Sequence, residues 1–212
     1  MSADANPGWR WLRIGLWVAA GLGVAALLFG IQTTNRQAET RSYGAMFGGP
    51  FTLTDTAGRT VTEASLKGRP YAVFFGFTRC PEVCPTTLST LTRLHQALYK
   101  AAEPRGKAAA PLHIVFVSVD PGHDTPASLG TYLASFPIPV TGLTGTPEQL
   151  ARIEKAYAVD VTKVPLEGGD YTIDHTASVY LMDANGRFVT TLGYDDSEAD
   201  KLTILRRFLA QP

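Results

Sequence analysis

The chain has 212 residues, a mass of 22.8 kDa and a formal net charge of zero. This length allows one compact domain with some extra segments, and it argues against two full domains. The neutral charge and the lack of a basic stripe argue against nucleic-acid binding, the 45% hydrophobic content argues against disorder, and the count of 2 cysteines excludes a disulfide-stapled scaffold.

The N-terminal part contains a candidate membrane anchor. Residues 14–31 form 18 consecutive uncharged residues, which as a helix approach the roughly 30 Å thickness of a bilayer's hydrocarbon core. Arg10 and Arg13 precede this run, and positive flanks stay in the cytoplasm. A cleaved signal peptide is the alternative, but the run is long for one and no Ala-x-Ala-like site follows. We predict a cytoplasmic segment at 1–13, a single transmembrane anchor at 14–31, and a periplasmic C-terminal part on a bacterial inner membrane.

The exported part opens with a tether and a hairpin. Residues 32–49 are polar without an apolar period and predict a tether, so the folded domain is expected to span residues 50–212. The segments 51–54 and 60–62 flank a turn signal at Gly58 and predict a short hairpin. Continuous apolar runs at 71–77 and 112–119 are typical of central strands that are buried on both faces.

Helices are predicted between and after these strands. An apolar stripe follows Cys84, and Thr125-Pro126 and Thr146–Gln149 carry the capping signals of two more helices. A short strand lies between those two helices, strands at 177–182 and 188–192 flank a turn, and a last helix starts near Asp196. This order predicts an α/β sandwich of the thioredoxin type with an N-terminal β-hairpin.

Both cysteines lie in the loop after the first buried strand. Cys80 and Cys84 are four residues apart, and in the first turn of a helix they would lie on one face about 5–6 Å apart. The helix N-terminus and Arg79 both favour the thiolate, and two thiolates select the soft ion Cu(I). The alternative is a structural disulfide, but one that closes so small a loop would stabilise the fold little. Thiol–disulfide exchange is the other chemistry that such a pair can perform.

A third metal ligand is sought among the four histidines. His95 lies too far along the helix, and His113 begins a strand at the wrong edge of the sheet. His123 follows the second buried strand, and His175 precedes the strand at 177–182, a position that normally holds a cis-proline beside the cysteines of a thioredoxin. The pattern favours His175 and leaves His123 open.

Four segments together resemble a known family. FGFTRCPEVCPTTL, VFVSVDPGHDTP, GLTG and YTIDHT occur in the order and spacing of the Sco/SenC copper proteins, and the resemblance covers about residues 50–210. It implies a thioredoxin-like fold, copper bound by Cys80, Cys84 and His175, and Asp120 near the site. One departure concerns His123, which stands where the family usually has Arg, so a group that titrates near neutrality replaces a permanent charge there. Asp120 and His123 are therefore candidates for the surroundings of the metal ligands.

The resemblance also implies a function. It predicts a membrane-anchored metallochaperone that delivers copper to the binuclear copper site of cytochrome c oxidase, with the copper-binding subunit of the oxidase as partner and a periplasmic protein as copper donor. The alternative is a thiol–disulfide oxidoreductase, an enzyme that uses Cys80 and Cys84 to reduce the cysteines of that same site. The two activities are compatible in one protein because thiolates ligate metal only when they are reduced.

Overall fold

The computed structural model of the protein describes residues 14–27, 29–30, 47–102 and 112–210, and the chain divides into two units, Met1–Ser42 and Tyr43–Pro212. In the first unit, residues 14–27 and 29–30 are helical. Among the described residues, no helix combines the length and apolar character needed to cross a membrane. The transmembrane helix predicted over 14–31 is therefore not confirmed. The predicted cytoplasmic segment 1–13 and most of the predicted tether lie outside the described residues.

The second unit contains a seven-stranded sheet with the strand order β2-β1-β5-β4-β3-β8-β9. The bounds of its strands are β1 Thr52–Asp55, β2 Thr60–Thr62, β3 Tyr71–Gly76, β4 His113–Ser118, β5 Val140–Thr144, β8 Val179–Met182 and β9 Phe188–Leu192. The central strands β3, β4 and β5 are parallel, whereas β1, β2, β8 and β9 pair antiparallel. The predicted N-terminal hairpin forms one edge of the sheet.

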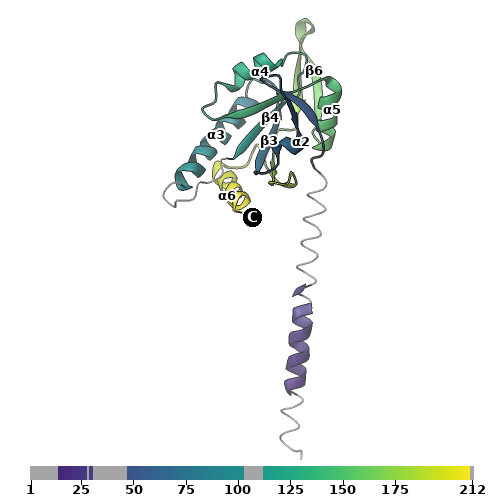
Figure 1. Ribbon diagram of the computed structural model, residues 1–212, viewed down its shortest axis with the longest axis vertical. Helices are drawn as coiled ribbons and strands as arrows, with labels where there is room; N and C mark the ends of the chain where they lie inside the picture. The colour runs from purple at the N-terminus through teal and green to yellow at the C-terminus, as the bar shows by residue number, and fades with distance from the viewer. Residues whose placement is uncertain (1–13, 28, 31–46, 103–111, 211–212) are drawn as a thin grey trace, which may run out of the picture. The chain divides into compact units, whose positions relative to one another are not determined.

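Helices cover both faces of this sheet (Figure 1). Their bounds are α2 Glu63–Leu66, α3 Val83–Ala102, α4 Pro126–Leu133, α5 Pro147–Ala156 and α6 Glu198–Leu209. Phe74 of β3 belongs to the core shared with α3, α4 and α6, and its neighbour Phe75 belongs to the core shared with α5. Successive strand residues point to opposite faces, so β3 is buried along its whole length, as its apolar sequence predicts. The architecture is the predicted α/β sandwich of the thioredoxin type.

Local capping explains where two of the helices begin. The Thr125 side chain accepts a hydrogen bond from the Ser128 N–H, and Pro126 occupies the first helical position of α4. Thr146 and Gln149 form a reciprocal capping box at the start of α5. Both starts confirm the predictions. The one-turn helix α2 was not predicted.

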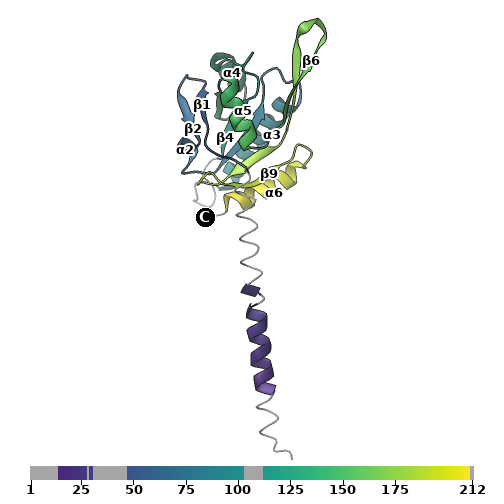
Figure 2. The same cartoon turned by 90° about the vertical axis from the view of Figure 1, so that its right-hand side faces the viewer.

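A separate two-stranded sheet carries the predicted histidine ligand. Its strands β6, Val161–Pro165, and β7, Tyr171–His175, pair antiparallel across a 3-10 turn at Glu167–Gly169. This hairpin extends away from the rest of the domain (Figure 2). His175 precedes β8, as predicted, but it is itself the last residue of β7, a strand that was not predicted, and β8 starts at Val179 rather than at residue 177. The hairpin was missed because β6 is mostly exposed and lacks a buried apolar face.

The folded unit begins before the predicted boundary at Pro50. The ring of Phe47 packs on the ring of Phe188 with centroids 4.7 Å apart, and the N–H of Gly48 donates to the Ala156 carbonyl at 2.7 Å. These contacts place residues 47–49, which were predicted as tether, in the domain.

Candidate metal centre

The cysteine loop leaves the sheet at the carboxyl end of β3. The N–H of Cys80 donates to the Phe77 carbonyl at 3.2 Å, which turns the chain back towards the domain. Because α3 begins at Val83, Cys84 lies in its first turn and Cys80 precedes the helix. The N–H of Cys84 donates to the Cys80 sulfur at 3.4 Å. The Cys80 sulfur thus accepts a hydrogen bond from one of the backbone N–H groups that a helix leaves unpaired at its N-terminus.

A buried carboxylate anchors this loop. Asp124 lies in the loop after β4 with only 1% of its surface exposed. Its carboxylate accepts hydrogen bonds from the Thr78 N–H at 3.0 Å, the Thr78 hydroxyl at 2.6 Å and the Ser118 hydroxyl at 2.6 Å. Asp124 was not among the predicted site residues. Its position just before the helix-capping Thr125, at the sheet edge where the chemistry was expected, is the signal that could have found it.

Gly76 leaves room for the second cysteine. A Cβ atom at this position would lie 2.8 Å from the Cys84 sulfur and 2.9 Å from the Phe116 ring. The missing side chain therefore lets Cys84 pack against the end of β3, where it is completely buried. Cys80 is only partly buried. The two sulfur atoms differ in their access to solvent and to a partner.

His175 reaches the cysteines from the end of β7. Its Nδ1 lies 3.0 Å from the backbone carbonyl of Thr176, which can only accept, so Nδ1 carries the proton. The other ring nitrogen, Nε2, is 3.6 Å from the Cys84 sulfur. The ring of Phe77 meets the imidazole edge-on, with centroids 5.9 Å apart and an interplanar angle of 82°. The backbone and an aromatic neighbour thus orient the imidazole with Nε2 towards the sulfurs.

The three predicted ligands form one cluster. The sulfurs of Cys80 and Cys84 and a ring nitrogen of His175 all lie within 4.8 Å of one another. Metal–sulfur and metal–imidazole bonds of about 2.3 and 2.0 Å place two ligands at most about 4.6 Å apart around one ion. Three donors cannot all reach this maximum at once, because donors spread evenly around one ion lie about 4 Å apart, so the three atoms could surround a single soft metal ion after shifts of less than about 1 Å. Two sulfurs and one imidazole nitrogen are a donor set that suits copper.

The two thiols have opposite acidities. A hydrogen bond from the Cys84 thiol is the main cause that lowers the pKa of Cys80 to about 4. Burial opposes this shift, and hydrogen bonds from His175 and from the backbone N–H groups of Cys84 and Glu82 add to it. The hydrogen bond to Cys80, burial and the Cys80 charge raise the pKa of Cys84 above its ordinary value. At neutral pH the pair therefore shares one proton, which Cys84 holds. A metal that binds both sulfurs displaces this proton.

Asp120 and His123 lie in a neighbouring polar cluster. Asp120 is completely buried, and its carboxylate accepts from the Tyr171 hydroxyl at 2.5 Å and from Nδ1 of His123 at 3.0 Å. Tyr171 opens the strand that ends at His175, and the bond to Asp120 raises the pKa of Tyr171 to about 12. Within the described part of the chain, the group of three ligand atoms includes neither Asp120 nor His123. The geometry thus places His175, and not His123, beside the two sulfurs.

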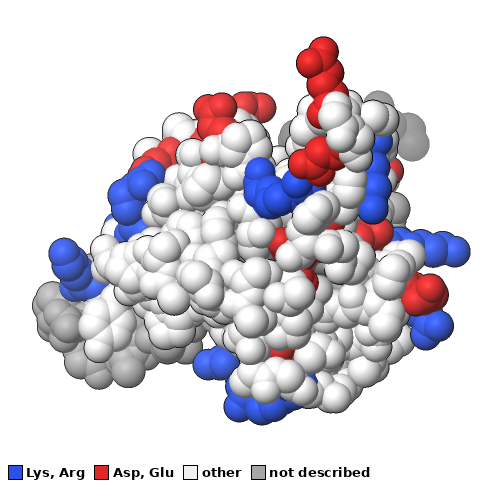
Figure 3. Space-filling view, turned by 90° about the horizontal axis from the view of Figure 1, so that it is seen from above, with Lys and Arg blue, Asp and Glu red and all other residues white. Residues whose placement is uncertain are grey.

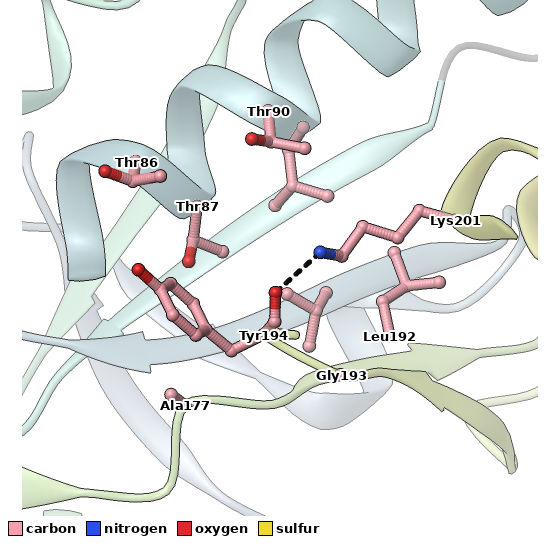
Figure 4. Close-up of a pocket in the computed structure, with 10 residues that line it drawn as sticks. Thr86, Thr87, Thr90, Ala177, Leu192, Gly193, Tyr194 and Lys201 are labelled. Carbon is pink, nitrogen blue, oxygen red and sulfur yellow. Dashed lines mark hydrogen bonds between the residues drawn. The ribbon is translucent and has the colours of Figure 1, made fainter. Parts of the chain in front are cut away.

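A small pocket lies next to the cluster but does not include it. Figure 4 shows the pocket between α3 and the segment after β9, with the Lys201 ammonium donating to the Tyr194 carbonyl at 2.8 Å. Its lining residues are Thr86, Thr87, Thr90, Leu91, Ala177, Val179, Leu192, Gly193, Tyr194 and Lys201. Its cavity volume of about 30 Å³ exceeds the roughly 10–15 Å³ that one water molecule needs, so the pocket has room for water.

The surface around the projecting hairpin carries charges of both signs. Figure 3 views the molecule from the end where β6 lies and shows acidic and basic side chains interspersed around a broad uncharged area. This face has no dominant sign of charge that would concentrate an ionic small molecule.

Most of this chain is similar to known proteins of one family. Residues 39–210 match the family model described as SCO1/SenC. Protein SCO2, mitochondrial, of Saccharomyces cerevisiae is 36% identical over 179 residues, which are 83% of this chain and 58% of that protein. The SCO2-like protein of Rickettsia conorii is 31% identical over 192 residues, 88% of this chain and 90% of that protein. The chain thus spans little more than half the length of the yeast relative and nearly all of the bacterial one.

Solved structures of similar proteins share the fold. Bradyrhizobium japonicum ScoI with copper bound is 43% identical with a TM-score of 0.66, and the match covers 76% of this chain and 99% of that chain. Yeast Sco1 with copper bound is 34% identical with a TM-score of 0.68, and the match covers 78% of this chain and 90% of that chain. With its family-model match, its sequence relatives and its ligand cluster at the end of a thioredoxin-type sheet, the chain belongs to the SCO1/SenC family.

Proposed function

We propose that this protein is a copper metallochaperone that holds copper between Cys80, Cys84 and His175. The observation that carries the proposal is the convergence of two sulfurs and one imidazole nitrogen within 4.8 Å. Structures with copper bound have been solved for two relatives, which are 43% and 34% identical to this chain over most of the domain. Two thiolates hold Cu(I), and the imidazole supplies the nitrogen that Cu(II) prefers.

The recipient in this proposal is the binuclear copper site of cytochrome c oxidase, with the copper-binding subunit as docking partner and a periplasmic protein as copper donor. The family resemblance of the cysteine and histidine motifs supports this assignment. Residues 14–31 anchor the chain in the bacterial inner membrane in the same proposal, with the copper-binding domain in the periplasm. The uncharged composition of that segment and the arginines that precede it support this placement.

The acidities of the two thiols favour reduction of a partner disulfide as a second function. The Cys80 thiolate attacks one sulfur of the disulfide, and the partner's other sulfur leaves as a thiolate. Cys84 then loses its proton and attacks the Cys80 sulfur, which releases the second partner thiolate. Cys80 and Cys84 end as a disulfide, and the partner gains two electrons and takes up two protons. A partly buried thiolate beside a buried thiol is suited to these two steps.

Copper binding by the purified full-length chain tests the metal site. Wild type is expected to bind one copper ion in either oxidation state, and Cys80→Ser and Cys84→Ser are expected to abolish tight binding of both. His175→Ala should weaken Cu(II) binding far more than Cu(I) binding. His123→Ala is the matched control and should have a small effect. If His123→Ala removes the Cu(II) signal and His175→Ala leaves it, the ligand assignment is wrong.

Oxidase assembly in cells grown at limiting copper separates the two functions. His175→Ala leaves both thiols in place, so thiol–disulfide exchange continues while Cu(II) retention is lost. The variant should assemble little oxidase if copper delivery is the task, and nearly the wild-type amount if thiol reduction is the task. Cys80→Ser is the reference for complete loss in both cases.

A further inference from the structure

The strand that carries His175 is not hydrogen-bonded into the main sheet. Among the described residues, β7 pairs only with β6, so apart from its two chain connections the two-stranded sheet is held to the domain by side-chain contacts. Ile173, which is 6% exposed, anchors β7 in the apolar core. Apolar contact is not directional, and burial of Ile173 alone does not fix how β7 is placed against the cysteine loop.

Directional contacts to β7 come from the residue next to Cys80. The Arg79 guanidinium donates to both carboxylate oxygens of Asp170 at 3.0 and 2.8 Å and to the Tyr171 carbonyl at 3.1 Å. It also lies over the Tyr171 ring, 5.3 Å from the centroid. Because Nη1 binds Asp170 and Nη2 of the same planar group binds the Tyr171 carbonyl, the contacts fix orientation as well as distance. Arg79 therefore joins the cysteine loop to the first residues of β7.

A second contact holds the same end of β7 from inside the domain. The Tyr171 hydroxyl donates to the Asp120 carboxylate at 2.5 Å, and Asp120 is fully buried in the loop after β4. Nδ1 of His123, 3.0 Å from the other carboxylate oxygen, completes the arrangement. We call Arg79, Asp120, Asp170 and Tyr171 the clasp. It joins three segments: the cysteine loop, the loop after β4 and the start of β7.

We propose that Arg79 and Tyr171 are positioning residues that hold the His175 ring nitrogen within 4.8 Å of the Cys80 and Cys84 sulfurs. This inference rests on the proposed copper site. Tyr171 and His175 lie four residues apart on one face of β7, about 13 Å along the strand. Because β7 is paired along its whole length with β6, it moves as one piece, and fixing its first residue fixes its last. The clasp therefore positions the imidazole ligand. Loss of that ligand weakens the binding of Cu(II) more than the binding of Cu(I).

Arg79 has a competing role, because its positive charge next to Cys80 also favours the thiolate. Arg79→Lys separates the two roles: the lysine keeps the charge and loses the planar pair of donors. Tyr171→Phe tests the clasp without changing any charge, since it removes only the hydroxyl that binds Asp120. Arg93→Ala is the matched control, because Arg93 makes a similar exposed pair with Glu198, at 2.9 Å, between α3 and α6.

Copper titrations of the full-length variants test the clasp. Arg79→Ala and Tyr171→Phe should each weaken Cu(II) binding about three- to tenfold, which corresponds to about 0.7–1.4 kcal/mol, the net contribution of about one hydrogen bond. In the electron paramagnetic resonance spectrum of the Cu(II) protein, the hyperfine lines from the coordinating nitrogen should broaden in both variants. The affinity for Cu(I) should change by less than about twofold. Arg79→Lys should behave like Arg79→Ala, and Arg93→Ala like wild type. Rescue by Arg79→Lys, or equal losses of Cu(I) and Cu(II), would overturn the proposal in favour of a charge effect on Cys80.

A double-mutant cycle tests whether the clasp acts through the histidine. In the His175→Ala background, Arg79→Ala should weaken Cu(II) binding no further. An undiminished additional loss would show that Arg79 does not act through His175.

Hydrogen exchange of the metal-free protein provides a test without copper. The backbone amides of β6 and β7 should exchange faster in Arg79→Ala and Tyr171→Phe than in wild type, and at the wild-type rate in Arg93→Ala. Unchanged exchange in both clasp variants would overturn the proposal. Failure of wild type to bind copper would instead overturn the proposed function, and the exchange measurement would still decide whether the clasp holds the strand.

Discussion

The buried carboxylate of Asp124 binds Thr78 twice, through the backbone N–H at 3.0 Å and the hydroxyl at 2.6 Å. Thr78 is two residues before Cys80, and Asp124 lies 46 residues further along the chain in the loop after β4. The cysteine loop is therefore held to the sheet edge by a group that is not itself a ligand. Groups that orient ligands in this way tune metal sites nearly as strongly as the ligands do.

Asp124→Asn should destabilise the domain and weaken copper binding. The amide nitrogen that replaces one carboxylate oxygen is a donor, and it would face either the Thr78 hydroxyl or the Thr78 N–H together with the Ser118 hydroxyl. Loss of these buried bonds is expected to cost about 3 kcal/mol in the free energy of unfolding, measured by denaturant titration. Asp195→Asn, on an exposed residue, is the control and should change stability by less than about 0.5 kcal/mol. Equal stability of the two variants would contradict the anchoring role of Asp124.

Gly76→Ala should damage the metal centre through packing alone. The new methyl group would lie 2.8 Å from the Cys84 sulfur and must displace that sulfur or the Phe116 ring. Overpacking of this kind lowers the free energy of unfolding by about 1–3 kcal/mol. Displacement of the Cys84 sulfur should also lower the copper affinity. Gly130→Ala in α4, whose added methyl would meet its nearest atom at 3.4 Å, should leave copper affinity unchanged. Thermal unfolding and copper titration measure the two effects, and wild-type copper affinity in Gly76→Ala would refute the argument.

Alkylation should modify Cys80 before Cys84 in the folded, metal-free protein. Hydrogen bonding, with the Cys84 thiol as the main donor, lowers the pKa of Cys80 to about 4, whereas burial and the Cys80 charge help to raise that of Cys84. The rate at Cys80 should therefore stay constant from pH 6 to 9 and fall only as the pH approaches 4. Peptide mapping after timed iodoacetamide treatment identifies the site. In the denatured chain both thiols should react, with rates that rise through their ordinary pKa; the same profile in the folded protein would contradict the prediction.

Copper should raise the melting temperature in a pH-dependent way. A ligand that binds only the folded state adds about 2.7 kcal/mol when its free concentration is 100 times Kd. Because the raised pKa of Cys84 keeps its proton bound in the metal-free site, each copper that binds near neutral pH releases one proton. At fixed excess of free copper the added stability should fall by about 1.4 kcal/mol for each unit that the pH is lowered from 9 to 7. Calorimetry with a buffered copper concentration checks this, and a pH-independent increment would show that Cys84 is not a ligand.

The sequence was most informative where local signals decide the structure. The capping residues Thr125 and Thr146 predicted the starts of α4 and α5 because a cap depends on residues within one turn. The apolar run at 71–77 predicted a central strand because burial on both faces requires it. The pair Cys80 and Cys84 was identified from its place after that strand.

Such local signals could not predict contacts between distant segments. The hairpin of β6 and β7 has little buried surface, so its strands show no clear alternation. The choice between His123 and His175 depended on where that hairpin lies against the cysteine loop. Asp124 and Tyr171 act through bonds that span 46 and 51 residues, and nothing in their immediate neighbours specifies the partner.

The separation of the ligands along the chain has a consequence for biosynthesis. Cys84 and His175 are 91 residues apart, and the histidine is placed only after β6 and β7 have paired. A chain that emerges from the ribosome shows both thiols early and lacks the imidazole until most of the domain has been made. In the proposed copper site a nascent chain therefore presents only the two sulfurs, and the imidazole joins them when the last third of the domain has folded onto the first.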